Sequence, residues 1–477
     1  MPVRQGQFVE VETEEGQVIA FVTNLIKTNR YFMRAESVKE YERGGRPLTA
    51  IFPADRWEYL IAEAQALGVQ GERGLERTTF PPSPGQKVCE AKSEVLTRFL
   101  GLNPDDGVEL GKLRHHELPV KLDLTRLLRK HVAVLAMSGA GKSVSTQVII
   151  EELLHRLPER GRPAVVVVDV HGEYGGLTES FPGRVSIVNG KELRIGVPSL
   201  SPWQFKEFVP DMSDVQAREL QRVLGELQAK MRAGGGPFGL DEVIAHVERD
   251  DEIHKQLQQA LLGWLFNLRS LDLFDRADYP SWQGIVEPGK AVIVDLSDIT
   301  SLRKKQMLVA YAARKLFNAR KRGWVPPFVF CLEEAHQFVP SSESKRTAIS
   351  RSIIEMLARE GRKFYASLVL ISQRPVRLST TVLSQANTNI ILRITNPYDL
   401  EHIKQSSEAI TGEVADMISS LPVGEALIVG EAVNHPIFVK VRRRRSRESA
   451  HGVSLEEAAK EFEKRRGQKR EDAKAFM

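Results

Sequence analysis

The stretch that decides the fold is Val132-Ala133-Val134-Leu135-Ala136-Met137-Ser138-Gly139-Ala140-Gly141-Lys142-Ser143. Residues 132–136 form an apolar run of strand length, and residues 144–157, which Pro158 stops, have the pattern of a helix. A loop of small residues between a buried strand and a helix N-terminus can point successive backbone N–H groups at an anion. The stretch therefore predicts a phosphate-binding loop, in which Lys142 would reach the β- and γ-phosphates of ATP.

Each part of this loop has a predicted role. The Ser143 hydroxyl would be a ligand of Mg²⁺, and glycines are needed where a Cβ would keep the backbone away from phosphate. The usual G-x-x-x-x-G-K-[ST] pattern has glycine at position 136, where this chain has Ala136, and alanine fits there if its φ is negative. The residues predicted to bind nucleotide within the loop are Ser138, Gly139, Ala140, Gly141, Lys142, Ser143 and Val144.

A pair of acids follows a second buried run. Residues 328–332 have strand character and are followed at once by Glu333 and Glu334. We expect Glu333 to hold Mg²⁺, directly or through water, and Glu334 to polarise the attacking water. The first acid of such a pair is usually Asp, and the alternative to a catalytic role is a solvated pair at a strand end.

Two further strand ends carry polar residues. Asp169 and Glu173 follow the apolar residues 164–168, and Gln373 follows residues 368–372. Because the carboxyl ends of parallel strands share one edge of a sheet, these residues are expected beside the phosphate loop. Asp169 would then contribute to the metal site, Glu173 would be part of the catalytic group, and Gln373 would sense the γ-phosphate. A plain turn is the alternative in both places.

The order of the segments predicts an α/β fold with more than one domain. Strands and helices alternate as in a parallel sheet covered on both faces, which predicts a RecA-like core at residues 106–441. An N-terminal β-rich segment ends near a Pro- and Gly-rich connection, and helices replace strands in an insertion whose role the sequence leaves open. The predicted domains are a small N-terminal β-barrel at 1–105, the core at 106–441 with a helical insertion at about 198–288, and a basic C-terminal tail with a helix at 442–477.

Composition narrows the class of protein. Of the 477 residues 42% are hydrophobic and 27% are charged, as in ordinary globular proteins. No apolar run approaches the roughly 20 residues that cross a bilayer, and the first residues lack a signal-peptide pattern, so we expect a cytoplasmic protein without a membrane partner. The two cysteines, Cys89 and Cys331, predict neither a disulfide framework nor a zinc site.

The charge is modest but unevenly distributed. The formal net charge is +5, and residues 440–447 form the dense basic run Lys-Val-Arg-Arg-Arg-Arg-Ser-Arg. Such a run is either a solvated tail or a surface that contacts phosphates or a partner. Both interpretations stay open at the level of sequence.

Taken together, these motifs resemble the HerA family of hexameric DNA translocases and helicases, within the wider HerA–FtsK class of P-loop ATPases. The resemblance covers nearly the whole chain, and residues 28–32 near the N-terminus are similar to part of that family's small barrel, the HAS-barrel. The segments that carry it are Lys130-His131, residues 137–143, residues 169–174, Glu333-Glu334-Ala335-His336, residues 358–364 and Ser372-Gln373-Arg374-Pro375.

The resemblance implies a homo-hexameric ring with ATP at each subunit boundary. A boundary site needs a cation from the neighbouring subunit to neutralise charge in the transition state. Arg359 and Arg362 are the candidates, and Lys130 is a third, at a position where the family tends to have arginine. A surface salt bridge is the alternative for each arginine.

The resemblance also implies partners. The ring would thread double-stranded DNA, held mostly through its phosphates, with Lys345 and Arg346 as candidate pore residues. In the family the barrel docks the NurA nuclease and the C-terminal tail braces the adjacent subunit. By analogy, the basic run after Lys440 would contact a neighbouring subunit rather than DNA.

Three functions are compatible with these features. The first is an ATP-driven DNA translocase that works with a nuclease in the resection of DNA ends during recombinational repair. The second is a conjugation- or secretion-type motor of the same class, and the third is a ring in which ATP binding only assembles a docking platform. Glu333, Glu334 and Gln373 favour turnover of ATP, because a platform needs no group that activates water.

Overall fold

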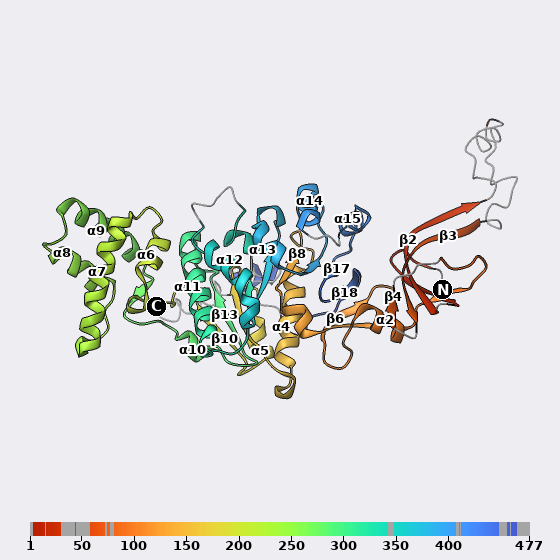
Figure 1. Cartoon of the computed structure of the whole chain (residues 1–477), viewed down its shortest axis with the longest axis horizontal. Coiled ribbons are helices and arrows are strands. Elements are labelled where there is room, and N and C mark those ends of the chain that lie inside the picture. The colour runs from red at the N-terminus through yellow and green to blue at the C-terminus, as the bar shows by residue number, and fades with distance from the viewer. Residues whose placement is uncertain are drawn as a thin grey trace.

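The structure is a computed structural model that describes residues 3–14, 16–29, 43, 58–71, 74–76, 81–341, 348–406, 410, 412–447, 456–457 and 459–464. The molecule is elongated, with an N-terminal sheet at one end, a large central sheet, and a cluster of helices at the other end (Figure 1). The predicted pore residues Lys345 and Arg346 lie outside the described residues. No helix among the described residues is long and apolar enough to span a membrane.

The central sheet has eleven strands, in the order β10-β13-β9-β14-β15-β8-β16-β17-β18-β6-β7. The first seven run parallel, as the alternation of strands and helices predicts. Their bounds are β8 Val132–Leu135, β9 Ala164–Asp169, β10 Val185–Asn189, β13 Ala291–Asp295, β14 Phe328–Leu332, β15 Ala366–Ser372 and β16 Thr388–Ile391.

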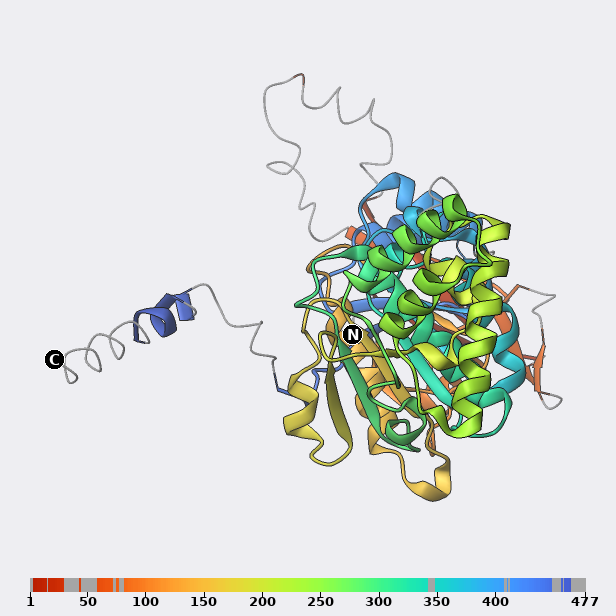
Figure 2. The same cartoon turned by 90° about the vertical axis from the view of Figure 1, so that its left-hand side faces the viewer.

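Burial explains why these strands were visible in the sequence. Every residue of β8, β9, β14, β15 and β16 is buried. β8, β14 and most of β9 and β15 are therefore apolar runs rather than alternating ones, whereas β16 begins with the buried polar residues Thr388 and Asn389. Helices surround this parallel part of the sheet (Figures 1 and 2). Their bounds are α3 Leu124–Leu128, α4 Lys142–His155, α5 Gly176–Ser180, α11 Leu302–Lys321, α12 Arg351–Glu360, α13 Thr380–Gln385, α14 Pro397–Ser406 and α15 Gly412–Ser419.

The sheet continues beyond β16 in antiparallel strands, which the expectation of a parallel sheet did not include. They are β17 Glu425–Gly430, β18 Ile437–Val441, β6 Val108–Leu113 and β7 Pro119–Leu122. Antiparallel strands tolerate polar side chains on one face, as Lys440 in β18 and Lys112 in β6 illustrate. Residues 108–122 therefore belong to the core sheet.

The N-terminal sheet is antiparallel, in the order β4-β3-β2-β1-β5. β1 and β2 form a hairpin, in which Thr13 of β1 pairs with Gly16 of β2. Within the described residues the two edges, β4 and β5, do not pair with each other, so the closure of the predicted barrel is not shown. The elements are β1 Phe8–Thr13, β2 Gly16–Asn29, β3 Glu58–Gly71, β4 Gly74–Glu76 and β5 Val88–Glu90, followed by α2 Ser93–Leu100.

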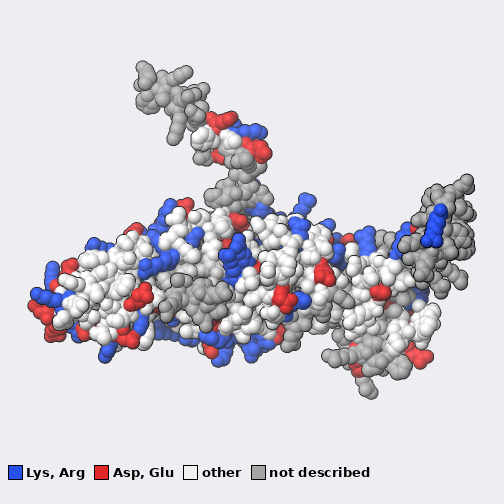
Figure 3. All heavy atoms as spheres, turned by 90° about the horizontal axis from the view of Figure 1, so that it is seen from above, with Lys and Arg blue, Asp and Glu red and all other residues white. Residues whose placement is uncertain are grey.

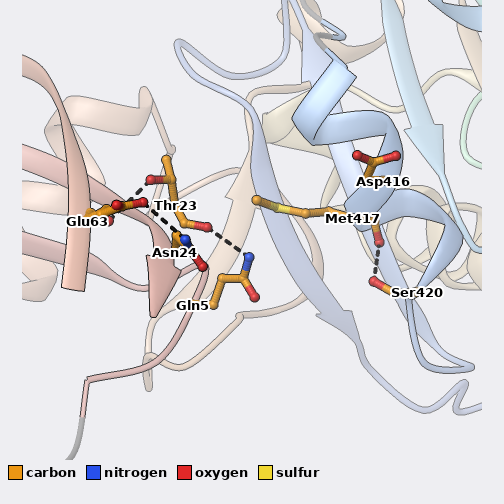
Figure 4. Close-up of a pocket in the computed structure, with 7 residues that line it drawn as sticks. All are labelled: Gln5, Thr23, Asn24, Glu63, Asp416, Met417 and Ser420. Atoms are coloured by element: carbon orange, nitrogen blue, oxygen red, sulfur yellow. Dashed lines mark hydrogen bonds between the residues drawn. The ribbon is translucent and has the colours of Figure 1, made fainter. Parts of the chain in front are cut away.

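Aromatic side chains join this sheet to the core. Phe8 and Phe21 pack edge to face with ring centroids 5.2 Å apart, and Phe21 stacks on Phe438 of β18 at 6.4 Å. Nearby, a polar pocket of about 430 Å³ lies between β2 and β3 on one side and α15 on the other. Gln5 lines it from the first side and Asp416 from the second (Figure 4). The two parts therefore share an apolar contact region next to a pocket with a polar lining.

The predicted insertion is helical and forms the far end of the molecule (Figure 1). Its helices are α6 Pro202–Phe208, α7 Asp214–Lys230, α8 Leu240–Arg249, α9 Lys255–Arg269 and α10 Trp282–Ile285. It also contains a short strand that was not predicted, β12 Phe274–Asp275, which pairs in parallel with β11 Ile195–Gly196. This pair ties the end of the insertion to its beginning.

Candidate nucleotide site

The predicted motifs end four adjacent strands. In the order β9-β14-β15-β8, the strands end at Asp169, at the Glu333–Glu334 pair, at Gln373 and at the phosphate loop. The structure thus brings the predicted side chains to one edge of the sheet. This is the carboxyl edge, where open α/β sheets bind their ligands.

The backbone of the loop is suited to an anion. Gly139 and Gly141 have φ angles of 75° and 102°, which favour glycine, and Gly141 caps the N-terminus of α4. Ala136 is buried, it is not among the residues with positive φ, and its N–H donates to the carbonyl oxygen of Ser372 at 3.2 Å. Alanine is therefore accommodated at the position where the usual pattern has glycine, as predicted.

Lys142 and Glu334 form an ion pair at the mouth of this loop. Lys142 Nζ contacts Glu334 Oε1, and the side chains are only 12% and 2% exposed. Glu334 has a left-handed backbone, with φ 48° and ψ 44°, which is strained for a residue that has a Cβ. The turn after β14 thus holds the second acid of the pair against the lysine of the loop.

Two histidines that we did not predict as site residues lie beside Glu334. His336 Nδ1 is 3.3 Å from Glu334 Oε2 and 3.2 Å from Ser372 Oγ, and His171 Nε2 is 3.9 Å from Glu334 Oε1. Burial lowers the pKa of His336, so its imidazole is neutral at pH 7. The position of His336 two residues after Glu334 was a signal available in the sequence. Gln373 is half-buried, and its side chain has no hydrogen-bond partner among the described residues.

A second group of acids lies behind this pair. Asp169 is buried and accepts hydrogen bonds from the backbone N–H groups of His171, Gly172, Glu173 and Tyr174 at 2.7–3.2 Å. Its carboxylate therefore organises the turn that follows β9. Glu333 Oε2 accepts from the N–H of Val170 at 2.8 Å.

These acids are close enough to perturb one another. Burial, together with the charges of Asp169 and Glu173, raises the pKa of Glu333 to about 9. Burial also raises the pKa of Asp169. Lys305 of α11, which the sequence did not identify, also lies near these acids. Burial lowers its pKa, and the charges of Glu333, Asp295 and Asp169 offset only part of this effect.

The donor set fits a magnesium ion bound together with phosphate. Glu333 Oε1, Glu173 Oε2 and Glu334 Oε2 are buried oxygens without a hydrogen-bond partner among the described residues. The described residues contain no group of three His, Cys, Asp or Glu side chains placed to hold a metal by themselves. Mg²⁺ is usually held by one or two carboxylates together with substrate phosphates. A magnesium site for ATP therefore does not require three protein ligands.

The three candidate cations lie elsewhere. Arg359 is in the last turn of α12, Arg362 is in the turn before β15, and Lys130 immediately precedes β8. Both arginines are exposed and have no hydrogen bond or ion pair among the described residues, whereas Lys130 Nζ pairs with Glu431. β15 has seven residues and so spans roughly 20 Å. These cations are thus at the amino edge of the sheet, remote from the loop of their own subunit.

The sheet, the loop and the acid pair define a P-loop ATPase with a RecA-like core. Residues 108–316 match the family model described as "Helicase HerA, central domain". The chain is 27% identical to the "DNA double-strand break repair helicase HerA" of Pyrococcus furiosus, over 91% of this chain and 87% of that protein. The relative of the same name from Saccharolobus solfataricus is also 27% identical, over 92% of this chain and 88% of that protein. The predicted resemblance to the HerA family is confirmed.

A solved structure agrees on the fold. VirB4 of Thermoanaerobacter pseudethanolicus superposes with a TM-score of 0.56 at 17% identity, over 72% of this chain and 98% of that one. At this level of identity the likeness concerns the fold alone. It confirms the predicted architecture of the core.

The Lys142–Glu334 ion pair yields a prediction about ATP binding. In Glu334→Gln the lysine loses its anionic partner and is free for phosphate, so we expect ATP to bind about tenfold more tightly, equivalent to about 1.4 kcal/mol. The measurement is the Kd of a fluorescent ATP analogue with and without Mg²⁺. Glu287→Gln is the control, because it removes a glutamate from a half-exposed pair with Lys290. Weaker binding by Glu334→Gln would contradict the competition between carboxylate and phosphate.

The raised pKa of Glu333 yields a prediction about pH. The folded protein keeps a proton on this acid up to a pH near 9, whereas the unfolded chain loses it near 4.5. The stability of the wild type should therefore fall over this range relative to Glu333→Gln, which has no proton to lose. We expect the Tm difference, variant minus wild type, to grow from pH 5 to pH 9 without nucleotide or metal. A difference that stays constant from pH 5 to pH 9 would show that Glu333 is already ionised in the folded protein.

Proposed function

We propose that this protein is an ATP-driven, ring-shaped translocase or helicase for double-stranded DNA. The observation that carries the proposal is the Lys142–Glu334 pair at the mouth of the phosphate loop, because it joins a phosphate-binding cation to an acid suited to activate water. The names of the HerA relatives support DNA as the polymer and double-strand break repair as the process.

Hydrolysis follows from the positions of the side chains. The N–H groups of residues 138–143 and Lys142 bind the phosphates, and Lys142 then turns from Glu334 to ATP. The released Glu334 orients the attacking water, with neutral His336 fixed beside it. Gln373, at the end of the adjacent strand, contacts the γ-phosphate.

Magnesium belongs to the same site. Ser143 and Glu333 are the proposed ligands, and Asp169, which we predicted as a third, orders the turn that carries Glu173. Bound Mg²⁺ would neutralise charge on the β- and γ-phosphates. Glu173 has an unpartnered buried oxygen and would accept hydrogen bonds from the water around the ion.

The site needs a cation from another copy of the chain. Arg359, Arg362 and Lys130 lie at the amino edge of the sheet, so they can approach a nucleotide only if it is bound to a neighbouring subunit. A head-to-tail contact that repeats and closes produces a ring, and we propose a homo-hexamer. The two exposed arginines are preferred over Lys130, which already has a partner in Glu431.

The DNA surface and the further partners are proposals too. On the face shown in Figure 3, Lys and Arg are interspersed with Asp and Glu along the whole molecule, so no continuous basic band marks DNA there. Phosphate contacts inside a ring, with Lys345 and Arg346 as candidates, remain the proposed mode. We further propose a cytoplasmic protein that has a NurA-type nuclease as partner, docked on the N-terminal sheet for end resection.

The alternatives differ in what they predict. A conjugation- or secretion-type motor shares the fold and would also hydrolyse ATP, but the HerA-named relatives favour repair. A docking ring without turnover does not need Glu334 in its strained position beside Lys142. The translocase is therefore the function that the site supports best.

ATP hydrolysis with and without linear duplex DNA tests the proposal. We expect DNA to stimulate the wild type about tenfold, and we expect Glu334→Gln to lose about 10²- to 10³-fold in kcat because its water-activating group is gone. Raising the salt should abolish the stimulation, since phosphate contacts are salt-dependent. Unstimulated hydrolysis would exclude the translocase, and full activity of Glu334→Gln would exclude its catalytic role.

Co-expression of two inactive variants tests the cation in trans. Lys142→Ala lacks the lysine that binds phosphate, and Arg362→Ala lacks the proposed cation, so each alone should be inactive. In mixed rings an intact loop can face an intact arginine, and we expect ATP hydrolysis to return. Arg359→Ala is tested in the same way. No recovery for either arginine would show that neither acts across the subunit boundary.

A further inference from the structure

The basic run of the sequence lies against the phosphate-loop helix of its own chain. Residues 442–447, which we call the basic strap, follow β18 and run along α4, the helix that begins at Lys142. Arg442 donates to Glu151 Oε2 and to Glu152 Oε1, both at 2.8 Å. Over these residues the strap is thus not a solvated tail, although the side chains of Arg443, Arg445 and Arg447 are exposed.

Glu151 is the anchor of the strap. Its side chain is fully buried, and it accepts hydrogen bonds from Arg445 N at 2.9 Å, Ser446 N at 2.8 Å and Ser446 Oγ at 2.7 Å. Burial acts to raise the pKa of Glu151, but the hydrogen bonds from Ser446 and Arg445 outweigh it and the pKa is lowered. A charged group without such donors would be costly to bury, so the carboxylate fixes the strap to α4.

A chain of hydrogen bonds leads from the strap into the active site. Arg444 Nη1 donates to Gln147 Oε1 at 2.8 Å, and Gln147 Nε2 donates to the carbonyl oxygen of Glu173 at 2.8 Å. The N–H of Glu173 then donates to Asp169 Oδ1 at 3.1 Å. Gln147 is 2% exposed, so water does not compete for its amide. The backbone N–H and C=O of Glu173 are therefore both held, the N–H by Asp169 and the C=O by Gln147.

Helix geometry explains why one segment makes both kinds of contact. Gln147 and Glu151 are four residues apart and lie on the same face of α4, which continues to Ser143 at the loop. The strap covers this face, so it contacts the anchor at Glu151 and the link at Gln147 together. The position of the Glu173 turn relative to the loop thus depends on Arg444, which follows Gln147 by 297 positions in the chain.

We infer that Arg444 and Gln147 are positioning residues for ATP hydrolysis. The strap, through Gln147, fixes the Glu173 turn at the position that hydrolysis needs, while the loop and Lys142 bind ATP independently of the Arg444–Gln147 link. This inference rests on the proposed ATPase activity but not on DNA translocation. Loss of the link should therefore lower kcat and leave KM for ATP nearly unchanged.

The test is a double-mutant cycle on hydrolysis without DNA. We expect Arg444→Ala and Gln147→Ala each to lower kcat about tenfold, with KM within about twofold of wild type, and the double variant to lose no more than either alone, because both break the same chain. Arg444→Lys, which can still donate to Gln147, should recover part of the loss. Arg443→Ala is the matched control, since Arg443 is exposed and its side chain makes no hydrogen bond or ion pair with the described residues.

Other outcomes would overturn the inference. Wild-type kcat in Arg444→Ala, or additive losses in the double variant, would show that the strap does not act through Gln147. If kcat fell only in proportion to Tm, and by the same amount in Arg442→Ala as in Arg444→Ala, the strap would only stabilise the fold. Hydrolysis without DNA stimulation would leave this inference standing and remove only the translocase, whereas absence of hydrolysis in the wild type would remove both.

Discussion

The crowding of several buried acids around Lys142 and Lys305 constrains the rest of this structure. Glu334 is neutralised by Lys142, whereas Glu333 keeps a raised pKa because it is buried and because Asp169 and Glu173 lie beside it. Burying like charges together is unfavourable unless cations or protons compensate for them. The site is therefore short of positive charge, and a phosphate that enters it would take Lys142 and make the shortage worse. Added cations, from the solvent or from a neighbour, are what such a site requires.

The parallel sheet decides where those cations can come from. It places the loop and the acids at its carboxyl edge and the exposed Arg359 and Arg362 at its amino edge. A single chain cannot bring both edges to one nucleotide, because the strands between them are rigid and buried. Repetition of the chain, head to tail, is the arrangement that brings the two edges together.

The parts of this protein that were predictable from sequence are those encoded locally. A buried parallel strand is an apolar run, and a polar residue directly after it marks the carboxyl edge, so Asp169, Glu333 and Gln373 were placed on the correct strand ends. The loop was predictable for the same reason, including the tolerance for alanine at position 136. Antiparallel β18 was not separated from the basic run that follows it, because its Lys440 already belongs to that run.

The features that escaped prediction depend on contacts between distant segments. His336 gains its place only when β14 and β15 pair, since its partner Ser372 comes from the end of the other strand. Lys305 is brought towards the acids by the packing of a whole helix, and its own sequence neighbours give no sign of it. The basic run looked like a surface for a neighbour or for phosphate, because a sequence shows charge but not the buried glutamate that receives it.

That buried glutamate has a consequence for the order in which the site is built. α4 carries the lysine that binds phosphate, yet the donors that satisfy Glu151 come from residues 442–446, near the end of the core. Until β18 has joined the sheet and the strap has docked, Glu151 is a charged group on the face of α4 that must be buried, and an unpaired charge opposes that burial. An apolar residue at this position would let α4 pack without the strap. A glutamate makes the packing of the phosphate-loop helix conditional on the C-terminal segment, so that the loop, the Glu173 turn and the strap reach their final positions together.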